Sequence, residues 1–153
     1  MSAHCLPLRV YFEDTDASGI MYHARYLAFF ERGRTEMLRG LGIDHAGMLA
    51  LPPAERLYFV VRRIGIDYRQ PARLDDLVSI ESRTLACHGA SLRVGQIMRR
   101  GDDVLAQAEI LVAMVGADGR AKRLPAEMRR LFRATMSGQT TAAQSDSATM
   151  DPS

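Results

Sequence analysis

The chain has 153 residues, of which 47% are hydrophobic and 25% are charged, with a formal net charge of +2. This length suits one domain, and the small net charge gives no electrostatic case for a nucleic-acid or anionic-membrane partner. The 2 cysteines are too few for a disulfide framework, so we predict a reducing compartment.

The N-terminal segment is MSAHCLPLRVYFED. It lacks the basic stretch followed by a long apolar run that a secretory leader carries. No apolar run in the sequence approaches the length of a membrane span. We therefore expect a cytoplasmic protein without an integral membrane segment.

The first predicted elements are a strand and a long helix. Alternation over residues 6–13 predicts a half-buried strand, and turn-forming residues follow over 14–22. The apolar face of this strand is expected to carry Leu8, Val10 and Phe12. From His23 to Leu41 the apolar spacing is helical, and its stripe comprises Tyr26, Phe29, Phe30, Gly33, Met37 and Leu41. Residues 44–55 contain two prolines and predict an irregular connection.

Strand-like runs then follow in quick succession, at residues 58–68, 77–85, 91–100 and 104–115. In the first run, one face is expected to carry Tyr58, Val60, Ile64, Ile66 and Tyr68. The links CHGA and RGDD are short enough for hairpins, which join antiparallel neighbours. A helix is predicted from Pro125 to about Ala134.

This order of elements predicts an α+β domain in which one antiparallel sheet wraps around one helix. Open sheet edges favour dimerisation. We assign the domain to residues 1–136, and we expect the small polar residues 137–153 to form a disordered tail.

Asp16 is the leading candidate for a functional carboxylate. A helix N-terminus offers unpaired backbone N–H groups and partial positive charge, which could hold a carbonyl oxygen. A carboxylate nearby could attack that carbonyl or activate a water molecule. The alternative is that Asp16 forms an Asx turn or a helix cap. Asp14 directly follows the strand, and we interpret it as a turn cap.

His23 stands where the helix should begin, and it could act through its imidazole or through its backbone N–H. Glu31 is a second candidate carboxylate, with surface ion pairing as its alternative role. Aromatic residues at helical spacing could line an acyl pocket, although plain core packing explains them as well. These are Tyr22, Tyr26, Phe29 and Phe30. No serine-hydrolase elbow, phosphate-binding glycine loop or zinc-ligand spacing is present in the sequence.

The run RVYFEDTDASGIMYHARYLAFFERGRTEMLR closely resembles the 4-hydroxybenzoyl-CoA thioesterase family of hotdog-fold proteins, in the branch associated with the Tol–Pal cell-envelope system (YbgC-type). FVVRRIGIDYRQPARLDD and GASLRVGQ are also similar to that family, so the resemblance covers about residues 6–135. Ser18 stands where the family has the first glycine of a pair, and Gly33 stands in place of a helix alanine.

The resemblance implies a hotdog fold and hydrolysis of an acyl-CoA thioester, of short-chain or aromatic acyl groups, or of an acyl carrier protein thioester. It implies that Asp16 is catalytic, that the backbone N–H near His23 polarises the thioester carbonyl, and that Tyr22, with Ser18 and Gly19, lies beside the substrate. It further implies a homodimer or homotetramer, no metal or other cofactor, and association with Tol–Pal at the inner membrane.

Two questions stay open on the sequence. Asp16 could act as a general base on water or as a nucleophile that forms a mixed anhydride. The rival function is a non-catalytic hotdog protein that binds acyl groups or serves as a scaffold in the Tol–Pal system. CoA phosphates would require positive charge near the site, and the available residues are Arg62, Arg63, Arg93, Arg99 and Arg100.

Overall fold

One antiparallel sheet and one long helix account for most of the computed structural model, which describes residues 3–147. The strands are β1 (His4–Arg9), β2 (Leu57–Tyr68), β3 (Leu77–His88), β4 (Ser91–Arg100) and β5 (Asp103–Gly116). The α-helices are α1 (Arg25–Gly40), α2 (His45–Leu49) and α3 (Ala126–Ser147), with short 3-10 turns at Phe12–Asp14 and Pro53–Glu55.

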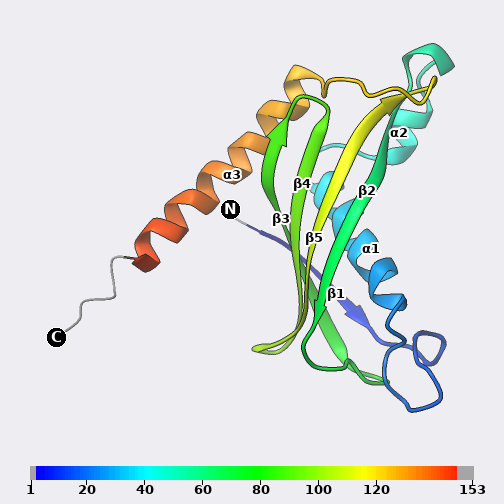
Figure 1. The fold of residues 1–153 in the computed structure, drawn as a ribbon, viewed down its shortest axis with the longest axis vertical. Coiled ribbons are helices and arrows are strands. Elements are labelled where there is room, and N and C mark those ends of the chain that lie inside the picture. The colour runs from blue at the N-terminus through cyan, green and yellow to red at the C-terminus, as the bar shows by residue number, and fades with distance from the viewer. Residues whose placement is uncertain (1–2, 148–153) are drawn as a thin grey trace.

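The strand order in the sheet is β1-β3-β4-β5-β2, and every neighbouring pair is antiparallel. The chain leaves β1 at one edge, forms α1, and returns as β2 at the opposite edge, so α1 crosses one face of the sheet (Figure 1). The helix α3 packs beside β3. The predicted architecture, a sheet wrapped around a central helix, is confirmed.

The core lies between α1 and the inner face of the sheet. The aromatic stripe of α1 is mostly core, because Tyr26, Phe29 and Phe30 are all buried. Gly33 lets the helix approach the sheet closely: a Cβ atom at this position would lie only 2.5 Å from Cγ2 of Ile80. The helix is therefore packed against β3 at a separation that any larger residue would disturb.

The first strand ends earlier than the sequence predicts. Its pairing with β3 stops at Arg9, and Phe12, which we expected on the apolar face, is 82% exposed in a 3-10 turn. The turn forms because the buried carboxylate of Asp14 accepts a hydrogen bond from the backbone N–H of Tyr11 at 2.8 Å. This local bond draws the chain out of the strand before Phe12 can face the core.

A β-bulge in β2 reverses the expected faces of its first half. The register with β5 shifts between Val61 and Arg63. Phe59 therefore pairs with the buried Met114 and faces inward. Tyr58 and Val60, which we predicted to share one face with Ile64, Ile66 and Tyr68, lie on the opposite, outer face. Beyond the bulge, the predicted inward residues of β2 keep their face. The extra residue at the bulge reverses which side chains of β2 face inward. The sequence VVRR at residues 60–63 does not indicate that a bulge occurs there.

Two connections also differ from expectation. The stretch predicted to be irregular contains the short helix α2, capped by Asp44, whose carboxylate accepts a hydrogen bond from the N–H of Gly47 at 2.6 Å. The last helix extends from Ala126 to Ser147 and so continues into the predicted tail. Residues 148–153 of that tail lie outside the described residues, and the division into domain and tail stays a prediction. Within the described part, no helix combines the length and apolarity that a membrane span requires.

Candidate active site

A tight loop between β1 and α1 carries Asp16. An isolated antiparallel bridge joins Thr15 to Met21, and the N–H of Asp16 donates to the carbonyl of Ile20 at 2.9 Å. Gly19 has a φ of +80°, which a glycine adopts without strain, whereas Ser18 does not adopt a positive φ. Serine in place of the family's first glycine is therefore compatible with this loop.

The Asp16 carboxylate is exposed, and one of its oxygens is held by Ser18. Oδ1 accepts hydrogen bonds from the backbone N–H of Ser18 at 2.8 Å and from its hydroxyl at 2.5 Å. The structure gives Oδ2 no hydrogen-bond partner among the described residues. One oxygen is thus fixed while the other faces solvent, where a water molecule or a substrate can reach it.

The same contacts favour the charged form of Asp16. The hydroxyl and backbone N–H of Ser18, with a smaller contribution from nearby His23, lower the pKa of Asp16 below its ordinary value. The carboxylate is consequently anionic around neutral pH, as both a nucleophile and a general base require.

The N-terminus of α1 lies next to this loop in the chain. Ala24 is the N-cap residue, and no side chain caps the helix. The backbone N–H groups of His23 and Ala24 have no acceptor among the residues that the structure describes. They are free donors with the partial positive charge of a helix N-terminus. The ring of exposed Tyr22 lies against the His23 ring, with 4.6 Å between centroids.

Tyr68, at the end of β2, holds the same segment from the sheet, a role that we did not predict from the sequence. Its hydroxyl donates to the backbone carbonyl of His23 at 2.7 Å, and its ring packs edge-on against Tyr26 at 5.0 Å. Tyr26 in turn accepts a hydrogen bond from the N–H of Ala72 at 3.0 Å. The only signal in the sequence was the polar end of a tyrosine on an apolar face, and this does not identify a partner 45 residues away.

Asp14 has the structural role that the sequence predicted. Its side chain is 2% exposed, and Oδ1 accepts a hydrogen bond from Nε of Arg25 at 2.6 Å. This bond raises the pKa of Arg25. Together with the bond from Tyr11, it ties the end of the first strand to the first residue of α1.

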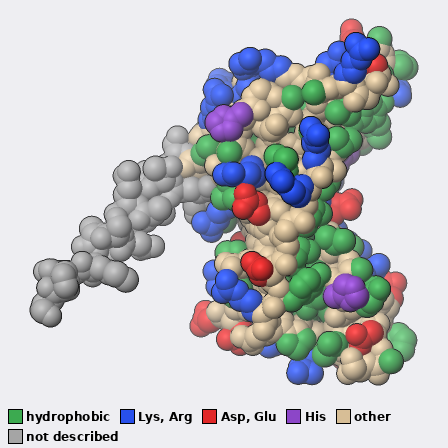
Figure 2. All heavy atoms as spheres, viewed as in Figure 1, with side chains coloured by type: hydrophobic (Ala, Val, Ile, Leu, Met, Phe, Trp, Pro, Cys, Tyr) green, Lys and Arg blue, Asp and Glu red, His purple; other side chains and the backbone are tan. Residues whose placement is uncertain are grey.

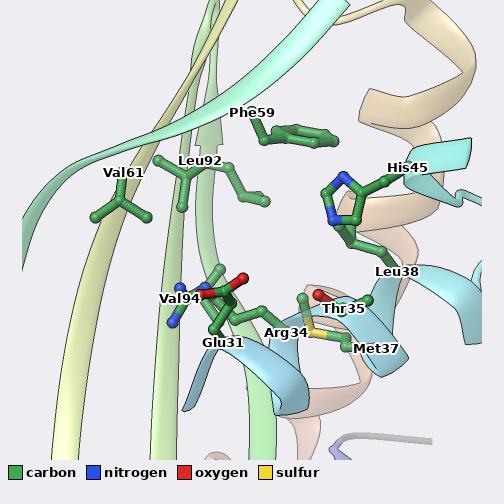
Figure 3. A pocket seen from close by; sticks show the side chains of 11 residues that line it. Glu31, Arg34, Thr35, Met37, Leu38, His45, Phe59, Val61, Leu92 and Val94 are labelled. Atoms are coloured by element: carbon green, nitrogen blue, oxygen red, sulfur yellow. The ribbon is translucent and has the colours of Figure 1, made fainter. Parts of the chain in front are cut away.

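Glu31, the second candidate carboxylate, belongs to a different region. It lies at an apolar chamber of about 250 Å³ between α1, α2 and the inner face of the sheet. Figure 3 shows Glu31 and Arg34 on the helix side of this chamber, with Phe59, Val61 and Leu92 facing them from the strands. Asp16 does not line it.

Arg34 anchors the floor of the chamber. Its Nη1 donates to Oε1 of the buried Gln96 at 3.0 Å, and Gln96 donates to the carbonyl of Phe30 and to Ser82 Oγ, both at 2.8 Å. Burial lowers the pKa of Arg34. Among the described residues, no group of three or more His, Cys, Asp or Glu could share a metal ion.

Arginine side chains are numerous on the outer face of the sheet, and Figure 2 shows blue side chains over the upper part of that view. Three of the five arginines that we considered for phosphate binding are already paired with acids: Arg93 with Glu109, Arg99 with Glu81, and Arg100 with Asp76. Arg62 and Arg63, at the bulge of β2, are exposed and have no ion pair in the described part of the chain.

Comparison with protein-family models matches residues 10–132 to the thioesterase-like superfamily. Curated relatives include the acyl-CoA thioester hydrolase YbgC of Escherichia coli, which is 46% identical over 110 residues, covering 71% of this chain and 79% of the relative. The acyl-CoA thioesterase YbgC of Haemophilus influenzae is 42% identical over 128 residues, covering 82% of this chain and 91% of the relative.

Among solved structures, the crystal structure of a probable thioesterase from Bartonella henselae superposes with a TM-score of 0.78 at 40% sequence identity. The match covers 81% of this chain and 100% of that one. The family match therefore includes the Asp16 loop, α1 and the strands β2 to β5.

Proposed function

Because this chain belongs to the thioesterase-like superfamily, we infer that it is an acyl-CoA thioesterase, and we propose that Asp16 is its catalytic carboxylate. The observation that carries the proposal is the position of an anionic aspartate, with one free oxygen, beside unpaired amides at the mouth of α1. Hydrolysis of a thioester needs both a group that delivers an oxygen nucleophile and donors for the oxyanion.

The proposed site stabilises the carbonyl oxygen of the thioester and lets the thiolate leave. In our proposal, the N–H groups of His23 and Ala24 donate to the thioester carbonyl oxygen and stabilise its negative charge in the tetrahedral intermediate. As that intermediate collapses, the carbon–sulfur bond breaks and the CoA thiolate leaves, taking up a proton from solvent. Tyr22, Ser18 and Gly19 would border the substrate in this arrangement.

Two routes deliver the oxygen. As a general base, Asp16 removes a proton from water while the water oxygen adds to the acyl carbon. As a nucleophile, Asp16 Oδ2 adds to that carbon, expels the thiolate to give a mixed anhydride, and is released when water hydrolyses the anhydride. Both routes start from the ionised carboxylate. In single-turnover hydrolysis in ¹⁸O-labelled water, entry of ¹⁸O into Asp16 would establish the nucleophilic route, because only attack of water on the aspartyl side of an anhydride labels that side chain.

The decisive experiment measures free-thiol release from short-chain, long-chain and hydroxybenzoyl CoA thioesters by the wild type and by Asp16→Asn. We expect the variant to lose a factor of about 10² to 10⁴ in kcat, with its unfolding curve unchanged because the side chain is exposed. Asp102→Asn changes an exposed carboxylate in the turn between β4 and β5, so it is the matched control and should retain activity. Turnover that survives in Asp16→Asn would refute the role of Asp16, and acyl-CoA binding without thiol release would identify a non-catalytic binding protein.

The proposed partner is a second copy of the chain, paired along β2. This strand is a long edge of the sheet, with its outer side unpaired in the described residues and with Val60 and Val61 exposed. Exposed apolar edges of this kind favour strand addition. A two-fold axis near the bulge would set the Leu57 end of one β2 against the Tyr68 end of the other.

This pairing would bring the apolar chamber of one copy, which Phe59 and Val61 help to form, toward the mouth of α1 in the other copy. A chamber of about 250 Å³ has room for roughly eight water-sized groups. That size supports short-chain or aromatic acyl groups as substrates. Acyl carrier protein thioesters carry the same thioester and pantetheine arm, so they should also be tested as substrates. We propose association with the Tol–Pal system from the sequence resemblance.

For the CoA phosphates, we propose Arg62 and Arg63, because they are exposed and free of carboxylate partners. Arg63 lies five residues before Tyr68 in β2, or about 17 Å along an extended strand. A phosphate site at a distance from Asp16 suits CoA, since the pantetheine arm separates the phosphates from the thioester.

A further inference from the structure

A second cavity lies at the end of α1 away from Asp16. It measures about 330 Å³ and is enclosed by the start of β1, the last turn of α1, the middle of β3, and α3. Figure 1 shows the beginning of β1 near α3, and both elements contribute residues to the cavity lining. Its walls include Met37, Leu41 and Thr135. It shares only Met37 with the chamber described above.

Two buried polar atoms at this cavity have no hydrogen-bond partner among the described residues: Oγ1 of Thr84 and Nδ1 of His4. Thr84 is 1% exposed. His4 pairs in register with Ser82, and Thr84 is two residues further along β3, so the two side chains share the inner face of the sheet. Ser82, between them, already accepts a hydrogen bond from Gln96.

Unpaired buried polar atoms are costly in a folded protein, at about 1–3 kcal/mol each, and are rare without a partner of some kind. A water molecule could satisfy these two atoms, but it would leave most of the cavity lining, which is apolar, without a matching contact. The cavity therefore suits a molecule with an apolar body and one compact polar group.

The chemistry of the lining defines that polar group. No carboxylate is among the described residues that form the cavity, whereas His4 and Arg83 both line it. The threonine hydroxyl and a histidine Nδ1–H can each donate one hydrogen bond. We propose that this cavity binds an aliphatic carboxylic acid, with the two oxygens of the carboxyl group accepting from Thr84 and His4 and the chain lying against Met37 and Leu41.

The size of the cavity sets the length of the acid. A volume of about 330 Å³ holds roughly ten water-sized groups, and octanoate has a similar number of heavy atoms. This site is separate from the Asp16 loop and is not needed for hydrolysis. Free acids are the class of molecule that thioester hydrolysis releases, so occupancy would make the protein responsive to the accumulation of that class of product.

The test is isothermal titration calorimetry of octanoate into the full chain, with octanol as the probe that has a chain and no carboxyl group. We expect saturable binding of one octanoate per chain and weaker binding of octanol. Thr84→Val keeps the shape of the side chain and removes the hydroxyl, and it should weaken octanoate binding by about tenfold. The variant should fold at least as well as the wild type, because it removes an unpaired buried group.

Gly40→Leu tests the cavity independently. Gly40 lies in the last turn of α1 and lines the cavity, and a Cβ atom there would be 3.7 Å from the His4 ring, an ordinary contact. The larger side chain should fill the space and abolish octanoate binding while thiol release is retained. Asp16→Asn is the control for binding at the proposed catalytic site and should bind octanoate like the wild type.

The proposal is overturned if the wild type shows no saturable binding, or if Thr84→Val and Gly40→Leu both bind octanoate as the wild type does. Loss of binding in Asp16→Asn alone would likewise overturn it, since the acid would then occupy the catalytic site. Each of these results leaves the thioesterase assignment untouched, because that assignment is measured by thiol release.

Discussion

The hydroxyl of Tyr68, the last residue of β2, donates a hydrogen bond to the backbone carbonyl of His23, 2.7 Å away. This bond couples the edge strand of the sheet to the segment whose N–H groups we propose as oxyanion donors. Burial, with a smaller contribution from Tyr26, raises the pKa of Tyr68. The hydroxyl therefore keeps its proton and remains a donor throughout the pH range of a thioesterase assay.

Replacing Tyr68 by Phe should lower kcat by up to about tenfold, the equivalent of one hydrogen bond, while KM changes little. The reason is that the ring contact with Tyr26 survives, and only the restraint on the His23 segment is lost. Steady-state kinetics with a short-chain acyl-CoA measures both constants. Tyr58→Phe, at the other end of the same strand, is the control. A rise in KM at constant kcat would assign Tyr68 to substrate binding instead.

Replacing Ser18 by Ala should shift the acid limb of the kcat/KM profile to higher pH. The hydrogen bonds from Ser18 lower the pKa of Asp16 in the wild type, and the side-chain bond is the largest contribution. Activity that needs the anion is present above this pKa and is lost as the pH falls through it, so raising the pKa removes activity at a higher pH. Rates measured from about pH 3 to about pH 7, around the ordinary pKa of an aspartate, test this shift, and circular dichroism verifies that the variant is folded. An unmoved acid limb would show that another group controls it.

Replacing Asp14 by Ala should lower the free energy of unfolding by about 1–3 kcal/mol, because the N–H of Tyr11 and the guanidinium of Arg25 both lose a buried acceptor. Urea denaturation monitored by circular dichroism measures the change. Glu13→Ala is the matched control: its exposed carboxylate lies 3.8 Å from Arg25, and surface pairs of this kind contribute little. Equal stability of the two variants would contradict the structural role of Asp14.

Replacing Val60 by Lys should convert the proposed dimer to monomer. Val60 is 39% exposed on the unpaired edge strand β2, and a charge there opposes strand addition. Light scattering coupled to size-exclusion chromatography gives the molar mass of the wild type and the variant. Leu77→Lys places the same charge at an exposed position on β3 and should leave the mass unchanged. A wild type that is monomeric at all concentrations would disprove the dimer.

The architecture could be predicted from the sequence because it depends on periodicity and on short hairpin links, both of which are local. The proposed site was predicted from a resemblance to the thioesterase family that is concentrated in one short segment, which contains Asp16, Ser18 and His23. The face of Phe59 was not predictable, since the bulge that turns it inward depends on pairing with β5 rather than on the residues around it. Tyr68 was missed because its partner at the helix mouth is distant in the chain.

Gly33 affects the apolar chamber between α1 and the sheet, although it does not line that chamber. With only a hydrogen where other residues carry a methyl group, it sets how near α1 can come to β3. A homologue with alanine at this position must either shift the helix or reposition the side chain that occupies the place of Ile80 Cγ2. The residues of α1 that form the chamber floor move with the helix axis. The size of the residue at position 33 therefore affects the depth of the chamber through the distance between α1 and β3. If acyl groups occupy the chamber as we propose, relatives could differ in acyl preference because of this one position outside the chamber lining.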